Sequence, residues 1–295
     1  MFLINYLKRY TIKGIIFKVK ELILFILTKI GIYSFLFAKK EWKRLPFDNV
    51  GYFKANEILN YSDNKLIEFV KSFEEQRYNK NNWRNHNNLW RKNLGLDSTS
   101  DKIIFDYGCG FGIESLQFAK NNNSIILGDI NNESLNIASK ILNTYNFEPI
   151  DKVLINNRYP FFDLTTKIDI FYSNGVLHHT PYIKEILTNA LQVMKPNGEI
   201  RLLLYTDKMW TGLTDTPPPP NDYHIQNHEK YWLFLRGADL VGQYADFYSE
   251  EKLQYQLGNN FKINEFSYIC GPRINNKNGN NLEGCYCTVI IKPKC

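Results

Sequence analysis

Alternating glycines between residues 108 and 112 are the part of this sequence best suited to hold a small ligand. The segment DYGCGFG, residues 106–112, directly follows a short apolar run. Glycine has no Cβ, so such a chain can turn sharply and let a ligand approach its backbone closely. The acid at Asp106 suits an ammonium group and would be unfavourable beside a phosphate. A dinucleotide-binding fingerprint would need its third glycine at position 113, where this chain has Ile113.

A second acid, Asp129, lies 23 residues after Asp106, at the end of the next apolar run. A carboxylate in that position can accept hydrogen bonds from both hydroxyls of a ribose. The alternative is that Asp129 simply caps the helix that follows it.

Two adjacent histidines form the third feature with chemical potential. The run SNGVLHHTP, residues 173–181, contains His178 and His179, and His224 follows in a later segment. Histidine is the commonest general base, so each of the three is a candidate catalytic residue. In the structural alternative, one of the paired histidines points inward to bond the backbone and the other is solvated.

The elements around these residues alternate between strands and helices. Strands are expected at 103–105, 124–127, 153–155, 168–172 and 200–205, with helices at 113–120, 133–145 and 183–194 and a turn at 196–198. This alternation predicts an α/β fold, with a parallel sheet covered by helices on both faces. Strands expected at 261–269 and 286–292 close the sheet edge, and helices are expected from residue 63 and at 250–257.

The first 45 residues differ in composition from the rest. Residues 1–44 hold ten Lys/Arg and two acids, a net charge of +8, so the remaining 251 residues carry −2 of the chain's +6. The body therefore lacks the broad basic surface of a nucleic-acid-binding protein. The apolar run at 22–38 contains Lys29 and is short for a membrane span, which needs about 20 residues. We predict a basic amphipathic helical arm, residues 1–45, that lies on a membrane surface or packs on the domain.

Three further regions follow the arm. Residues 46–101 are expected to be a helical N-terminal extension, and residues 102–295 the main domain. Four consecutive prolines, 217–220, mark an inserted lid at about 207–248. The five cysteines do not resemble a disulfide framework, and no metal site is predicted.

Taken in order, the glycine loop, Asp129 and the NGVLHH run at 174–179 resemble the class I S-adenosylmethionine-dependent methyltransferases, in a subgroup with GVLHH after the fourth strand. The resemblance covers about residues 102–205. It implies a Rossmann-like fold, an antiparallel closing strand and S-adenosyl-L-methionine as the cofactor. It also places His178 and His179 near the reacting methyl group, with His224 in the insertion able to close over the substrate.

The resemblance also implies a set of residues that bind the methyl donor. They are Asp106, for the ammonium group; Gly108, Gly110 and Gly112, for the methionine moiety; Asp129, for the ribose; Ile130, beside the adenine; Asn156 or Asn157, after the third strand; and Asn174 and Leu177, in the donor pocket. The chain departs from the family's usual Asp-x-Leu-Pro-Phe run, of which only RYPF at 158–161 is present.

The acceptor is the least determined part of the prediction. Methylases of exocyclic base amines carry an Asn/Asp-Pro-Pro-aromatic run after the fourth strand, which this chain lacks. A small-molecule, glycan or lipid-linked acceptor is expected instead, with a saccharide favoured because the aromatic residues of the insertion could stack on sugar rings. The predicted location is cytoplasmic, with peripheral membrane contact through the arm. The alternatives are a different nucleotide-dependent enzyme, such as a reductase, and a catalytically silent binding protein with the same fold.

Overall fold

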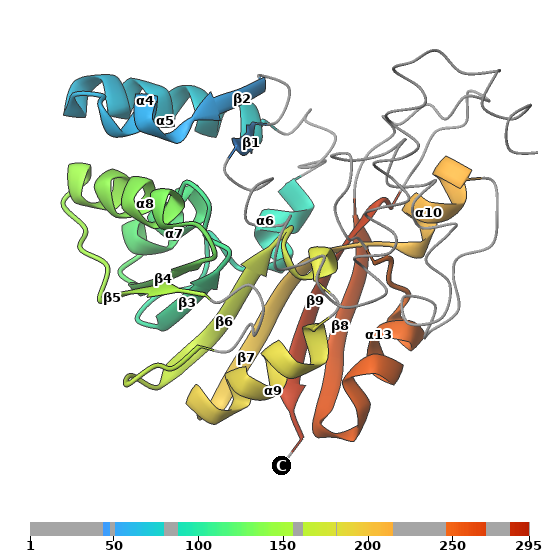
Figure 1. Ribbon diagram of the computed structural model, residues 1–295. Coiled ribbons are helices and arrows are strands. Elements are labelled where there is room, and N and C mark those ends of the chain that lie inside the picture. Colours follow the sequence, from blue (N-terminus) through green and yellow to red (C-terminus); the bar gives the residue numbers. More distant parts are fainter. Residues whose placement is uncertain are drawn as a thin grey trace, which may run out of the picture.

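A seven-stranded sheet forms the centre of the protein in the computed structural model (Figure 1). The structure describes residues 44–47, 51–79, 88–155, 162–180, 182–214, 246–269 and 284–294. The strands lie in the order β5-β4-β3-β6-β7-β9-β8. They are β3 (Ile103–Tyr107), β4 (Ser124–Asp129), β5 (Asp151–Leu154), β6 (Ile168–Asn174), β7 (Met194–Tyr205), β8 (Phe261–Ile269) and β9 (Tyr286–Pro293). A separate antiparallel pair consists of β1 (Arg44–Phe47) and β2 (Gly51–Lys54).

The strands from β3 to β7 run parallel, which confirms the parallel sheet predicted from the alternating elements. Parallel neighbours need a crossover, and the chain supplies a helix after β3, after β4 and after β6. As a result, the carboxyl ends of β3, β4, β6 and β7 meet at one edge of the sheet. β9 runs antiparallel to both of its neighbours, β7 and β8.

Helices cover both faces of the sheet. One hydrophobic core contains residues of α4 (Ala55–Leu59), α5 (Asp63–Arg77), α6 (Leu89–Asn93), α7 (Ile113–Lys120) and α8 (Asn132–Thr144). The other contains residues of α9 (Ile183–Val193) and α13 (Glu250–Leu257). The helix α10 (Asp207–Thr214) follows β7, and two short 3-10 helices are η3 (Leu177–His179) and η4 (Gly258–Asn260).

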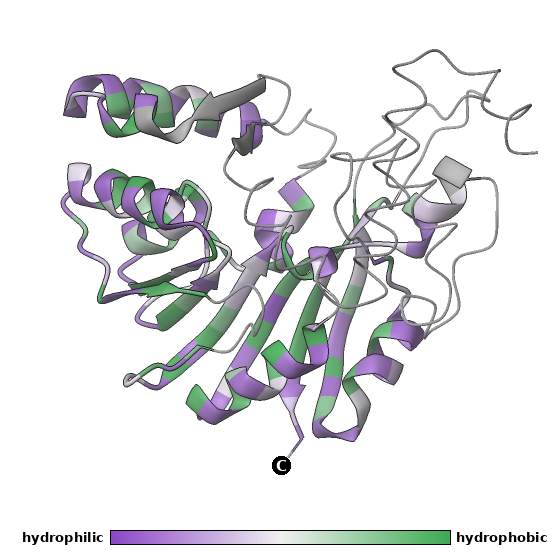
Figure 2. Cartoon of the chain, viewed as in Figure 1, coloured by the Kyte–Doolittle hydropathy of each residue, from purple (hydrophilic) through white to green (hydrophobic). Residues whose placement is uncertain are grey.

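Alternating side chains along the strands supply both cores. In β3, Ile104 belongs to the core under α7 and α8, and Phe105 belongs to the core under α9. The same alternation separates Leu203 from its neighbours Leu202 and Leu204 in β7. Figure 2 shows the matching pattern on the helices, where hydrophobic and hydrophilic residues alternate along α5 and α8. The central strands are therefore buried on both faces, which explains their continuous apolar runs.

One detail differs from the elements predicted from the sequence. Residues 196–198 were expected to form a turn before a strand that starts at Ile200, but they lie within β7. Ile168 pairs with Met194 and Ile170 with Glu199, so β7 absorbs the extra residues as a bulge. The two strands predicted to close the sheet edge do so, with β9 paired to β7 and β8 paired to β9.

Several predicted features lie outside the described residues. They are most of the N-terminal arm, the centre of the insertion at 215–245, and the site candidates Asn156, Asn157 and His224. Among the helices in the described ranges, none is long and apolar enough to cross a membrane.

Candidate functional site

The glycine loop joins β3 to α7 at the carboxyl edge of the sheet. Gly108, Gly110 and Gly112 all have positive φ, at +82°, +52° and +71°. A Cβ at position 108 would lie 2.4 Å from the Cγ2 of Val176. A Cβ at position 110 would meet no atom within 4 Å, so this glycine borders open space. The loop thus combines tight packing at its first glycine with room for a ligand at its second.

Asp129 ends β4 directly beside this loop. Its Oδ2 accepts a hydrogen bond from the backbone N–H of Gly110 at 3.0 Å, and its Oδ1 accepts one from the N–H of Asn131 at 2.9 Å. Burial raises the pKa of Asp129 to about 6, and these backbone donors partly oppose that shift. Asn131 is the residue that caps α8, because its side chain accepts from the N–H of Glu133. The cap interpretation of Asp129 is therefore wrong, and its carboxylate instead links the strand end to the glycine loop.

Asp106 lies one strand away and is 2% exposed. Its Oδ2 accepts a hydrogen bond from the hydroxyl of Ser115 at 2.5 Å. Burial, together with the nearby carboxylates of Glu114 and Asp129, raises the pKa of Asp106 to about 7, although the hydrogen bond from Ser115 opposes the shift. Buried acids this close to one another are costly to ionise, so a bound cation would stabilise them.

The end of β6 contributes the third side of the site. The side-chain amide of Asn174 donates to the hydroxyl of Tyr172 at 3.1 Å and to the Oε1 of Glu114 at 3.5 Å. The next side chain toward the loop is Val176, which packs against Gly108. Leu177 is fully buried and belongs to the core under α9. Ile130 is partly buried and packs against the same core.

The two histidines have different surroundings. His178 is fully buried, and its ring stacks on Tyr205 with centroids 3.6 Å apart. Its Nδ1 accepts a hydrogen bond from the backbone N–H of Tyr205 at 3.3 Å, and its carbonyl accepts from the N–H of Asp246 at 2.7 Å. His179 is half-buried and meets the Tyr205 ring edge-on at 5.3 Å. His178 thus has the environment of the inward-pointing structural histidine, and His179 is the more accessible of the two.

Arg77 and Glu114 belong to this region although the sequence did not single them out. The Nε of Arg77 lies 2.5 Å from the Oε1 of Glu114, and their side chains are 12% and 10% exposed. Arg77 ends α5, in the extension that precedes the sheet. No motif marks such an arginine, because only the packing of α5 on α7 brings it to Glu114.

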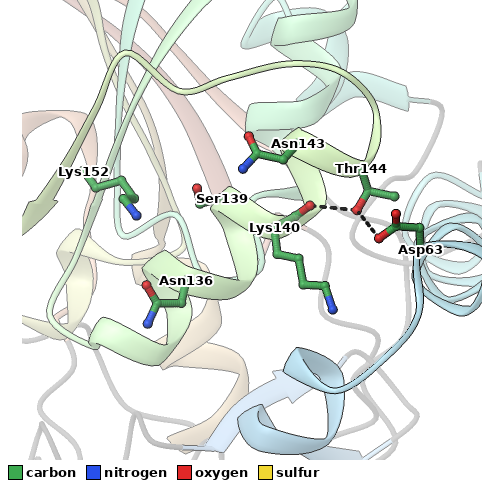
Figure 3. Close-up of a pocket in the computed structure, with 7 residues that line it drawn as sticks. All are labelled: Asp63, Asn136, Ser139, Lys140, Asn143, Thr144 and Lys152. Carbon is green, nitrogen blue, oxygen red and sulfur yellow. Dashed lines mark hydrogen bonds between the residues drawn. The ribbon is translucent and has the colours of Figure 1, made fainter.

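A cavity of about 330 Å³ lies elsewhere, between the start of α5, the outer side of α8 and β5 (Figure 3). Its lining residues are Asp63, Asn136, Ser139, Lys140, Asn143, Thr144 and Lys152. The ammonium of Lys140 donates to the carbonyls of Leu59 and Tyr61, at 2.9 Å and 2.5 Å. This cavity contains none of the predicted site residues. Within the described ranges, no cluster of three or more His, Cys, Asp or Glu could hold a metal ion.

Substitutions at two glycines of the loop can separate a role in packing from a position that borders open space. We expect Gly112→Ala to lower the free energy of unfolding by about 2–4 kcal/mol, because it combines positive φ with a steric clash. The new Cβ would lie 2.7 Å from the Cβ of Ala138 on α8. Gly110→Ala is the matched control, with an expected loss of only about 1 kcal/mol because its Cβ enters open space. Urea unfolding followed by circular dichroism measures both, and equal losses would contradict this account.

Comparisons with known proteins agree with this geometry. Residues 105–200 match a family model described as a methyltransferase domain. Over 127 residues the chain is 31% identical to the ubiquinone/menaquinone biosynthesis C-methyltransferase UbiE of Rickettsia typhi (strain ATCC VR-144 / Wilmington). That alignment covers 40% of this chain and 50% of UbiE, so the chain matches about half the length of this curated relative.

Solved structures resemble this chain at low sequence identity. A provisionally assigned methyltransferase from Bacillus halodurans C-125 has a TM-score of 0.50 and 13% identity, over 70% of this chain and 98% of that one. An S-adenosylmethionine-dependent methyltransferase from Clostridium acetobutylicum ATCC 824 has a TM-score of 0.49 and 11% identity, over 77% and 98% of the two chains. At 13% identity, the likeness to the Bacillus halodurans protein shows the fold alone.

Proposed function

We propose that this chain, which carries a methyltransferase domain on the class I S-adenosylmethionine-dependent methyltransferase fold, transfers a methyl group from S-adenosyl-L-methionine to a small-molecule acceptor. The observation that carries the proposal is the pair of buried carboxylates, Asp106 and Asp129, on either side of a glycine loop that borders open space. An ammonium group and a ribose are the ligand parts that such acids suit. S-adenosylmethionine contains both.

The proposed donor site follows from the position of each residue. Asp106 binds the ammonium group, and the backbone of Gly110 lies along the methionine moiety. Asp129 accepts from the ribose hydroxyls, and Ile130 flanks the adenine. The remaining predicted members are Gly108, Gly112, Asn156 or Asn157, Asn174 and Leu177. When bound, the donor supplies an electrophilic methyl group, and the protein's part is to hold the two reactants in line and exclude water.

For the acceptor, we propose only a class of molecule. UbiE is by name a C-methyltransferase of ubiquinone and menaquinone biosynthesis, which favours a small molecule methylated on carbon. The saccharide preference drawn from the aromatic insertion stays a prediction, as do a glycan or lipid-linked acceptor and membrane contact through residues 1–44. An acceptor carbon, oxygen or nitrogen that carries a proton also needs a base.

His179 is the histidine we propose for that base among the described residues. We expect His179→Ala to lower methyl transfer about 100-fold while leaving donor affinity unchanged, because a general base acts in the transition state. His178→Ala is the contrast, since loss of a buried stacked ring should lower the thermal unfolding temperature. Transfer by His179→Ala within about threefold of wild type would show that this residue is not the base.

The experiment that tests the function is transfer of a radiolabelled methyl group from S-adenosylmethionine into a fractionated lysate of the source organism. Label that enters a small-molecule or lipid fraction with wild type, but not with Asp129→Ala, would support the proposal and narrow the acceptor. A reductase would instead bind NAD(P)H more tightly than S-adenosylhomocysteine. A silent fold would transfer no label to any fraction.

A further inference from the structure

We propose that Arg77 and Trp90, both from the helical N-terminal extension, bind the carboxylate of the donor's amino-acid tail. This inference rests on the proposed function and names residues outside the matched range of 105–200. It makes the extension part of the donor site rather than a cover for the sheet.

The first support is that α5 contacts the glycine loop itself. The rings of Phe69 and Phe73 on α5 meet the ring of Phe111 edge-on, with centroids 5.8 Å and 6.1 Å apart. Phe111 is part of the loop, between Gly110 and Gly112, and is buried. The helix that carries Arg77 is thus packed against the loop that approaches the ligand.

The second support is the place and charge of Arg77. Its guanidinium is paired with Glu114, in the first turn of α7, and Glu114 in turn contacts Asn174 at the end of β6. The positive charge of Arg77 also lowers the pKa of Asp106. Asp106, Glu114 and Asp129 surround the loop with negative charge, which would repel the carboxylate of a zwitterionic tail. A carboxylate needs a cation there, and a guanidinium has five donors that can serve more than one partner.

The third support is a buried donor beside this arginine. The indole N–H of Trp90 on α6 is buried and has no hydrogen-bond partner within the described residues. The guanidinium carbon of Arg77 lies over the Trp90 ring, 5.7 Å from the ring centroid. A buried polar group without an acceptor is unfavourable, so an oxygen ligand at this position would stabilise the protein. Arg77 and Trp90 together provide a charged and a neutral donor for one carboxylate.

The test compares two ligands that differ only in the carboxylate, S-adenosyl-L-homocysteine and its decarboxylated analogue. Calorimetric titration of the full chain gives the dissociation constant of each. We expect Arg77→Gln to weaken S-adenosylhomocysteine about tenfold or more and to leave the analogue within about twofold. Trp90→Phe removes the N–H and keeps most of the ring, so a several-fold loss confined to S-adenosylhomocysteine is expected even if Arg77→Gln does not fold.

Lys120→Gln is the matched control. The ammonium of Lys120 on α7 pairs with Glu74 on α5 at 2.9 Å, so this variant removes an ion pair from the same helix interface at an exposed position. It should change neither dissociation constant. The inference is overturned if Arg77→Gln or Trp90→Phe leaves the affinity for S-adenosylhomocysteine unchanged, or weakens both ligands equally. If wild type binds neither ligand, the proposed function fails as well.

Discussion

Replacing Asp129 by alanine is expected to weaken binding of S-adenosylhomocysteine about 100-fold or more and to abolish methyl transfer. Each hydrogen bond from a ribose hydroxyl to the charged carboxylate is worth about 1.5–3 kcal/mol, and two are lost together. The change also removes the acceptor for the N–H of Gly110, so the loop loses its link to the end of β4. Both effects act on the donor and neither requires knowledge of the acceptor.

Asp151→Ala serves as the control for this prediction. Asp151 begins the neighbouring strand β5 and is exposed, and its side chain accepts only from the adjacent N–H of Lys152 among the described contacts. It should bind S-adenosylhomocysteine as wild type does. Calorimetry measures both variants, after circular dichroism has shown that each is folded. A folded Asp129→Ala protein with an affinity within about threefold of wild type would contradict the assigned role.

Asp106→Asn is expected to increase the free energy of unfolding and to weaken binding of the donor. Burial, with help from Glu114 and Asp129, raises the pKa of Asp106 to about 7, whereas the unfolded chain has the ordinary value near 4. Between these values the folded state holds more protons than the unfolded state, so this group's contribution to stability falls as the pH rises. Asparagine keeps an oxygen for the hydroxyl of Ser115 and carries no charge. We expect the free energy of unfolding to increase by roughly 2–4 kcal/mol at pH 8, and by about 2 kcal/mol less at pH 5.5.

The same substitution should weaken S-adenosylhomocysteine about tenfold or more, because the ammonium group loses its counter-charge. In wild type, affinity should decline as the pH falls below about 7, where Asp106 takes up a proton. Urea unfolding at the two pH values and calorimetry across the range measure these effects. A variant that is less stable than wild type at pH 8, or that binds the ligand equally well, would show that Asp106 is not an ionised donor ligand.

The sheet and the carboxyl-edge residues could be predicted because local patterns specify them. The strand patterns at 103–105 and 168–172 and the acids near the ends of β3 and β4 can be read from the sequence without knowledge of long-range contacts. The irregularity in β7 was not, because Pro196 and Gly198 lie where its pairing with β6 is interrupted, between Met194 and Glu199. These turn-forming residues interrupt the pairing but do not end the strand.

Part of the candidate site could likewise be predicted from the sequence, and part could not. Asp106 and Asp129 flank the glycine loop as expected, because both lie at the carboxyl ends of neighbouring parallel strands. The environment of His178 could not be read from its neighbours, since its partner Tyr205 lies 27 residues away. Arg77 lies 37 residues before Glu114, and only the docking of α5 brings them together. A residue that reaches a site from outside the repeating strand-helix pattern leaves no periodic signal.

Calorimetric titration of the full chain with S-adenosylhomocysteine and, separately, with NADPH at pH 8 decides whether the glycine loop binds a methyl donor. We expect saturable binding of one S-adenosylhomocysteine per chain, lost in Asp129→Ala, with no comparable binding of NADPH. Tighter binding of NADPH, or no binding of S-adenosylhomocysteine by folded wild type, would contradict the assignment of the glycine loop and its two acids to a methyl donor.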